Sequence, residues 1–155
     1  MRPDGRLSRM LHVLIHMDRH EGAATSEVIA HMLGANPVVI RRTMAGLRDR
    51  GYVHSEKGHG GGWTLARPLD QMTLLDIYEA IGKPSLFALG PASDNPTCLV
   101  EQAVNGALAK ALDDAEKLLL ARFGEVTLAD VAGDFEQRMA QHPEIQAQQG
   151  AECGK

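Results

Sequence analysis

The chain has 155 residues, of which 44% are hydrophobic, 23% charged and only 4% aromatic; such a composition is typical of one globular domain with a small appended element. Its two cysteines, Cys98 and Cys153, are too few for a disulfide-rich scaffold or for a typical structural zinc or iron–sulfur site. We find neither an apolar run of about 18 residues nor an apolar leader, so we expect a cytoplasmic protein without a membrane span.

The net charge of −4 is the sum of two oppositely charged parts. Residues 1–67 hold ten basic and six acidic residues, which gives +4, together with six of the seven histidines. Residues 68–155 hold six basic and fourteen acidic residues, which gives −8. A basic unit followed by an acidic unit fits a DNA-binding head on a solvating or oligomerising body.

Three amphipathic helices are predicted in the N-terminal third of the chain. Apolar residues at three- and four-residue spacing predict the first helix over 7–20. Thr25 or Ser26 caps a second helix, because short hydroxyl side chains accept hydrogen bonds from free amides at a helix start. Asn36 caps the third helix, and Pro37 occupies its first position, where proline is favoured.

The hydrophobic period then changes from helical to strand-like. Residues 52–55 and 63–66 are predicted to form two strands, and the segment between them holds four glycines in five residues, which favours a turn. We expect Trp63 to anchor this hairpin on the third helix. Thr73 caps a short fourth helix. Three helices followed by a glycine-tipped hairpin predict a winged helix-turn-helix, a mainly α fold with a small β-hairpin.

The chain is predicted to divide into four parts. A winged helix-turn-helix DNA-binding domain spans 1–82, and a linker rich in proline and glycine spans 83–95. A long dimerisation helix, starting near Pro96, and a short helix that packs back fill 96–140. The polar tail 141–155 is expected to be disordered.

Apolar positions along the long helix step by three or four residues, close to a coiled-coil seam. Many of them are small, which lets a partner helix approach closely. Because the head already closes a small domain of its own, we expect this face to bind a second copy in a homodimer. The expected interface is Val100, Val104, Leu108, Ala111, Ala115 and Leu118.

DNA contacts are expected from the third helix, because the second helix of a helix-turn-helix enters the major groove. Arginine binds guanine or phosphate, and valine meets the thymine methyl group, while the wing reaches the backbone or the minor groove. The expected contacts are Thr25, Ser26, Asn36, Pro37, Val38, Val39, Arg41, Arg42, Thr43, Arg48, Lys57 and His59. A winged-helix module that binds proteins without binding DNA is the alternative.

No catalytic or metal site is predicted. His12, His16 and His20 recur every four residues on the first helix, but three imidazoles on one straight helix do not converge on a metal ion. The glycine-rich segment lies between two strands and lacks the Lys-Ser or Lys-Thr pair of a phosphate-binding loop. The sequence also lacks a nucleophile elbow and a plausible pair of carboxylates, so we do not expect an enzyme.

Cys98 is the candidate switch. If Asn95 caps the long helix and Pro96 is its first residue, Cys98 lies near the third position, beside the hinge between head and body. The helix dipole and free amides there lower a thiol pKa and make the thiolate more reactive. An inert interface thiol is the alternative. Cys153, in the tail, could resolve an oxidised Cys98, but we favour an unused exposed thiol.

Four segments resemble the bacterial Rrf-two family of winged-helix regulators, the group of IscR, NsrR and CymR. They are TSEVIA at 25–30, LRDRGYVHS at 47–55, GHGGGWTLAR at 58–67 and TLLDI at 73–77. The resemblance covers about residues 7–82 closely, and the linker and long helix in outline. It implies a homodimer with crossing long helices, two heads on a palindromic operator, and usually repression.

Many members of the family hold an iron–sulfur cluster through three cysteines between the fourth helix and the long helix. Here that stretch offers only Cys98, so we expect no cofactor; an iron–sulfur-dependent gas or iron sensor is the alternative function. Cluster-free members include thiol-based redox sensors and regulators that respond to partners or small molecules, and Cys98 matches the position where such members often keep one cysteine. We therefore expect a DNA-binding repressor. From the place of the Cys98 thiol at a helix start, we hypothesise that its oxidation releases DNA, and the inducer is left open.

Overall fold

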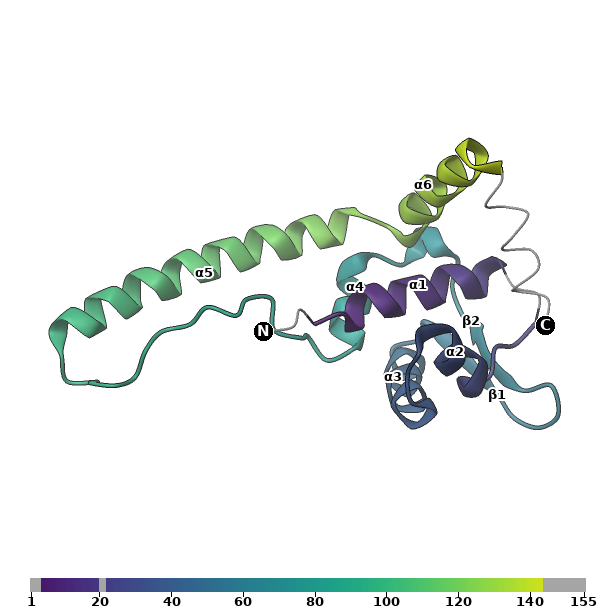
Figure 1. The fold of residues 1–155 in the computed structure, drawn as a ribbon, viewed down its shortest axis with the longest axis horizontal. Helices are drawn as coiled ribbons and strands as arrows, with labels where there is room; N and C mark the ends of the chain where they lie inside the picture. The colour runs from purple at the N-terminus through teal and green to yellow at the C-terminus, as the bar shows by residue number, and fades with distance from the viewer. Residues whose placement is uncertain (1–3, 20–21, 144–155) are drawn as a thin grey trace.

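The computed structural model describes residues 4–19 and 22–143. The elements in chain order are α1 (Arg6–Arg19), α2 (Ser26–Leu33), α3 (Pro37–Asp49), β1 (Val53–Glu56), β2 (Gly62–Leu65), the 3₁₀ turn η1 (Leu69–Gln71), α4 (Leu74–Ala80), α5 (Leu99–Glu125) and α6 (Leu128–Gln141). Helices α1 to α4 and the hairpin form a head, α5 projects from it as a long arm, and α6 lies against the head again (Figure 1). The expected fold class is confirmed.

The helices of the head begin where the capping residues predict. The backbone N–H of Val28 donates to Thr25 Oγ1 (3.2 Å), and that of Val38 donates to Asn36 Oδ1 (2.8 Å). Gly34 ends α2 in the left-handed conformation, with φ 59°, which costs glycine little. These local interactions fix the ends of the two helices that form the helix-turn-helix.

The β1–β2 hairpin is held at its base by the segment that precedes α2. The strands pair antiparallel, with Glu56 opposite Gly62, and Ala24 forms a further β-bridge with Trp63. Trp63 is buried, and its Nε1–H donates to Ser26 Oγ at 2.9 Å. β1 packs against α3, and Trp63 belongs to the apolar cluster that includes Ile40, Met44 and Leu47 of α3. The hydrogen bond of its indole, which the sequence did not predict, is to the start of α2.

The core of the head includes a residue from the C-terminal helix. Leu128 of α6 is fully buried in the same apolar cluster as Met72 and Ile77. Its backbone N–H donates to the carbonyl oxygen of Met72 (2.8 Å), beside an antiparallel bridge between Thr73 and Thr127. The apolar core that the sequence assigns to 1–82 thus depends on a segment beyond the linker.

Two capping boxes flank this bridge and start α4 and α6. In each, a threonine hydroxyl accepts from the backbone N–H of the aspartate three residues later, and the aspartate accepts from the threonine backbone N–H. Burial by itself would raise the pKa of Asp76, but hydrogen bonds from Thr73 and Tyr52 bring that pKa below its ordinary value. The carboxylate is therefore charged at neutral pH and accepts the hydrogen bond of the Thr73 backbone N–H at the start of α4.

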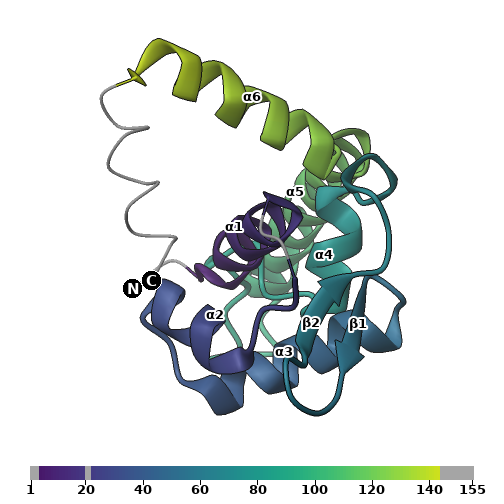
Figure 2. The same ribbon diagram turned by 90° about the vertical axis from the view of Figure 1, so that its right-hand side faces the viewer.

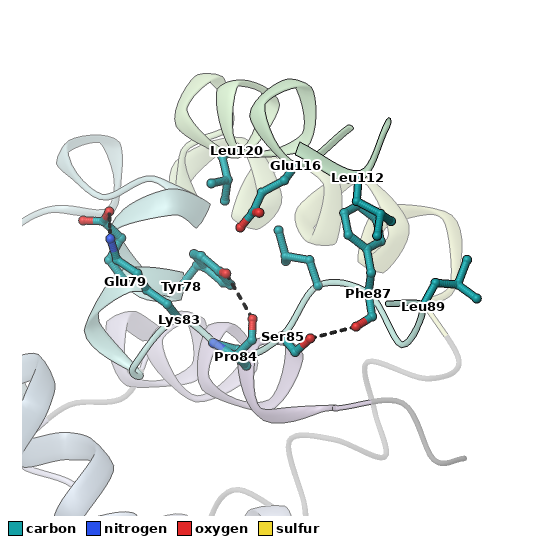
Figure 3. Close-up of a pocket in the computed structure, with 11 residues that line it drawn as sticks. Tyr78, Glu79, Lys83, Pro84, Ser85, Phe87, Leu89, Leu112, Glu116 and Leu120 are labelled. Carbon is teal, nitrogen blue, oxygen red and sulfur yellow. Dashed lines mark hydrogen bonds and ion pairs between the residues drawn. The ribbon is translucent and has the colours of Figure 1, made fainter. Parts of the chain in front are cut away.

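The linker runs back along α5 (Figure 1). The Tyr78 hydroxyl donates to the carbonyl oxygen of the buried Pro84 (3.0 Å), and Asn105 Nδ2 donates to the carbonyl oxygen of Ala92 (2.7 Å). A cavity of about 400 Å³ lies between α4, the linker and α5. Figure 3 shows Glu116 and Leu120 of α5 facing Tyr78 across it. These contacts fix where the linker leaves the head.

Helix α5 begins later than the sequence predicts. Residues 96–97 form a turn, and Cys98 is the N-cap of a helix whose first residue is Leu99. The side chain of Asn95 accepts from the Thr97 hydroxyl (3.1 Å), and its backbone carbonyl accepts from the Cys98 N–H (2.9 Å). Asn95 is therefore used in the turn, and neither it nor Pro96 starts the helix as expected.

Within the described residues, no helix is long and apolar enough to cross a membrane. Helix α6 extends to Gln141, the first residue of the expected tail, and the disorder expected beyond it stays a prediction. Residues 144–155, and with them Cys153, lie outside the described residues.

Candidate nucleic-acid interface

Helix α3 has one buried face, an outer face opposite to it, and two flanks between them. Ile40, Met44 and Leu47 face the core. At about 100° per residue, Val38 and Arg42 lie opposite that buried face. Both side chains are exposed and face away from the core of the head.

The two flanks of α3 face different neighbours. On one side Arg41 reaches α2, where it forms an ion pair with Glu27. On the other side Val39 and Thr43 line a hollow of about 450 Å³ that continues to Arg6 and the end of α4. The Thr43 hydroxyl donates to the carbonyl oxygen of Val39 (3.0 Å), a local bond on this second flank.

The basic side chains of the head differ in their partners. Arg48 Nε and an Nη donate to the neighbouring Asp49 at 3.1 and 2.9 Å, and Arg41 is paired with Glu27. Arg42 and Lys57 are exposed, and none of the described carboxylates lies within ion-pair distance of either. Both cations are therefore available to an anionic partner.

The tip of the hairpin lies on the same side of the head as α3. Lys57 and His59 are both exposed on the turn between β1 and β2. Figures 1 and 2 show α2, α3 and the hairpin together, on the side of the head away from α6. One flat or grooved partner could therefore meet the helix and the hairpin tip at once.

Ser26 is a correction to the expected DNA contacts. Its side chain is buried and accepts the indole N–H of Trp63, so it supports the hairpin and does not face outward. Sequence patterns give no sign of this pairing, because the two residues are 37 positions apart. Thr25, Asn36 and Pro37 lie at the starts of α2 and α3 as predicted, and any contact of theirs with DNA stays a prediction.

The seam expected on α5 is exposed along its length. No residue of α5 is buried, and the exposed fraction is 72% for Val100, 52% for Val104, 42% for Leu108 and 75% for Leu118. Ala111 and Ala115 are exposed between them. The half-buried positions of the helix form a neighbouring stripe that packs on the head and linker, and this stripe includes Leu112, Leu119 and Phe123.

The sequence suggested that Cys98 lies beside the junction of head and arm, and the structure places it elsewhere. It caps the N-terminal end of α5, which lies far from the head in Figure 1. The 27 residues of α5 span about 40 Å at about 1.5 Å per residue. The junction is at the other end, at Val126, whose carbonyl oxygen accepts from Leu74 N–H (3.0 Å).

The donor set of the described residues does not fit an iron–sulfur cluster. Such clusters take several cysteine thiolates, and Cys98 is the free cysteine in the described part of the chain. Among residues 4–19 and 22–143, no three histidine, cysteine or carboxylate side chains gather as possible metal ligands. The ring centroids of His12 and His16 lie 4.6 Å apart, but two imidazoles do not make a group of three ligands.

Comparisons with known proteins place this fold among transcriptional regulators. Residues 4–134 match the model of the family Rrf2, described as iron-dependent transcriptional regulator. YwnA of Bacillus subtilis, a proposed HTH-type transcriptional regulator, is 30% identical over 131 residues, which cover 83% of this chain and 95% of YwnA.

Solved structures agree in fold. A proposed transcriptional regulator from Lactobacillus plantarum has a TM-score of 0.71 at 24% identity, over 92% of this chain and 97% of its own. A proposed DNA-binding protein has a TM-score of 0.64 at 26% identity, over 81% and 97%. With a winged helix-turn-helix head, a long C-terminal helix and a family model that spans most of its length, the chain belongs to the Rrf2 family of DNA-binding transcriptional regulators, which are not enzymes.

Proposed function

We propose that the protein is a homodimeric repressor that binds a palindromic operator, with α3 of each protomer in the major groove and the hairpin tip on the backbone or in the minor groove. The observation that carries this proposal is a pair of exposed cations, Arg42 on α3 and Lys57 on the hairpin turn, with which no described carboxylate forms an ion pair. The two elements that carry them, α3 and the hairpin, lie on one side of the head (Figure 2). DNA presents a dense row of phosphates to such a surface. In a dimer, two such basic heads can meet one duplex, although the net charge per chain stays −4.

The dimer is argued from the exposed seam of α5. An arm of about 40 Å that buries no residue gains little from tertiary packing, which supplies most helical stability in proteins. A second copy of the same seam would bury Val104, Leu108 and Leu118, and the small side chains of Ala111 and Ala115 would let two helices cross closely. Two-fold symmetry then matches the symmetry of a palindromic operator.

The DNA interface is tested by a gel shift on the promoter of the protein's own gene over a series of salt concentrations. Arg42→Ala should weaken binding and make the slope of log K against log salt shallower by roughly 1, the effect of one lost phosphate contact. The matched control is Arg138→Ala on α6, which removes an exposed arginine far from α3. Unchanged binding by Arg42→Ala together with Arg41→Ala would contradict the placement of α3 in the groove.

The dimer is tested by sedimentation velocity. Ala111→Glu places a charge on the seam and should shift the protein to a monomer. Ala109→Glu is the matched control, because Ala109 is exposed and lies about 160° around the same helix from Ala111, at about 100° per residue. A wild-type monomer at micromolar concentration, or a dimer that survives Ala111→Glu and not Ala109→Glu, would contradict the proposed seam.

We propose that Cys98 makes the regulator responsive to peroxides. Its thiolate, held at the N-terminus of α5, would attack a peroxide oxygen, forming a sulfenic acid and releasing water or an alcohol. Because Cys98 is about 40 Å along the arm from its own head, the change would act through the dimer contact and the partner protomer.

The redox proposal predicts that peroxide releases the wild-type protein from DNA and leaves Cys98→Ser bound. Cys153→Ser is the control, and it should respond like the wild type if Cys153 is unused. A Cys98→Ser variant that still releases DNA on oxidation would refute the proposal.

We also propose that the protein works without an iron–sulfur cluster, because one described thiol per chain is a poor donor set. A preparation purified under anaerobic conditions should be colourless and free of iron. Visible absorbance that accompanies stoichiometric iron would support the cluster-dependent alternative.

A further inference from the structure

Two neighbouring arginines of α3 have different surroundings. Arg41 donates a hydrogen bond from its guanidinium to Glu27 Oε1 of α2, and both side chains are more than half exposed. Arg42, the next residue, faces outward, and none of the described carboxylates pairs with it. The difference suggests that the two cations make different kinds of contact with DNA.

The carboxylate that holds Arg41 is itself fixed. Glu27 lies in the first turn of α2, and its pKa is below the ordinary value because its own backbone N–H and Arg41 both donate to the carboxylate. A negative charge at a helix N-terminus is also favoured by the helix dipole. Glu27 is thus charged, and it links the start of the first helix of the motif to the side of α3.

A paired arginine suits a base contact better than a phosphate contact. Phosphate binding depends on net positive charge, and a carboxylate beside the guanidinium cancels much of it. A bidentate contact to guanine O6 and N7 depends instead on the direction of two N–H groups. Because a guanidinium has five N–H donors, Arg41 can keep its bond to Glu27 and still present two donors to a base.

We propose that Glu27 is a positioning residue that holds Arg41 to read a guanine of the operator, while Arg42 and Lys57 bind backbone phosphates. The proposal rests on the placement of α3 in the major groove proposed above. It assigns specificity to a residue of α2, outside the helix that enters the groove.

The proposal has a consequence that a purely structural ion pair would not have. Glu27 brings a negative charge close to DNA, where it opposes binding to any sequence. Glu27→Gln should therefore bind non-specific DNA equally well or more tightly, and at the same time lose discrimination at one base pair of each half-site. A structural role would instead lower binding to all sequences together.

The experiment is selection of DNA fragments by the full-length purified protein, followed by titration on the selected site and on variants with single base changes. The wild type should prefer one G·C pair by roughly 5- to 150-fold, the range of one bidentate arginine–guanine contact. Glu27→Gln should reduce that preference severalfold at this position only. Arg41→Lys, which keeps the charge and loses the bidentate geometry, should lose preference at the same position.

The matched control is Asp49→Asn, which removes one acidic charge from the same head and frees Arg48 instead of Arg41. It should keep the full base preference. A wild-type protein that selects no sequence would overturn the proposed function and this inference together. A selective wild type whose preference is unchanged in Glu27→Gln and Arg41→Lys would overturn this inference alone.

Discussion

Truncation of Leu128 tests whether the C-terminal helix is part of the head. Leu128 is fully buried beside Met72 and Ile77, and Leu128→Ala removes three carbon atoms from that contact. At about 0.8 kcal/mol for each buried carbon, the lost transfer free energy is about 2.4 kcal/mol. A residual cavity adds to this, so we expect the free energy of unfolding to fall by about 3–4 kcal/mol.

The assay is urea unfolding followed by the fluorescence of Trp63, the chain's one tryptophan. Trp63 is buried between the hairpin and α2, so its signal reports the head, while the substitution is on α6. Wild type and variant are compared at equal protein concentration, because dimerisation would add to the measured stability.

Leu89→Ala is the control, because it removes the same atoms from a leucine that is 77% exposed in the linker. It should change the free energy of unfolding by less than about 0.5 kcal/mol. A Leu128→Ala variant within the same 0.5 kcal/mol of the wild type would show that the head folds without α6.

Three further predictions concern the head. Ser26→Ala leaves the indole N–H of Trp63 buried without an acceptor and should lower the free energy of unfolding by about 1–3 kcal/mol; no loss in urea unfolding would mean that the hydrogen bond does not hold the hairpin. Gly62→Ala should cost about 1–3 kcal/mol by the same measurement, because Gly62 has φ 149° and an added Cβ would lie 2.7 Å from the carbonyl oxygen of Ala24. Because folding lowers the pKa of Asp76 below 3.8, its contribution to stability is complete well above that pH and is lost as pH falls through the folded value. Asp76→Asn should therefore show a shallower loss of stability below about pH 4, and equal acid profiles would count against this role.

The local elements of the head could be predicted from the sequence because short-range interactions specify them. Thr25 and Asn36 cap α2 and α3 as predicted, since a cap depends on residues two or three positions away. The alternating pattern and the run of glycines likewise predict the hairpin. Membership of the Rrf2 family also followed from these head motifs and is confirmed.

The start of α5 shows where local rules conflict. Asn95 and Pro96 have the types of a cap and a first helical residue, yet Asn95 forms a turn with Thr97 and Cys98. Both arrangements use the same short polar side chain, so a turn and a helix cap compete for it. Sequence patterns therefore identify the helix and miss its first residue.

Sequence by itself determined the winged helix-turn-helix, the exposed seam of α5 and the basic side chains of α3 and the wing. Only the tertiary structure decided that Leu128 completes the head, that Ser26 is buried under Trp63, that Cys98 lies at the far end of the arm and that Glu27 holds Arg41. The physical reason is the same in each case: these features depend on contacts or distances between residues far apart in the chain, and neither periodicity nor capping carries that information.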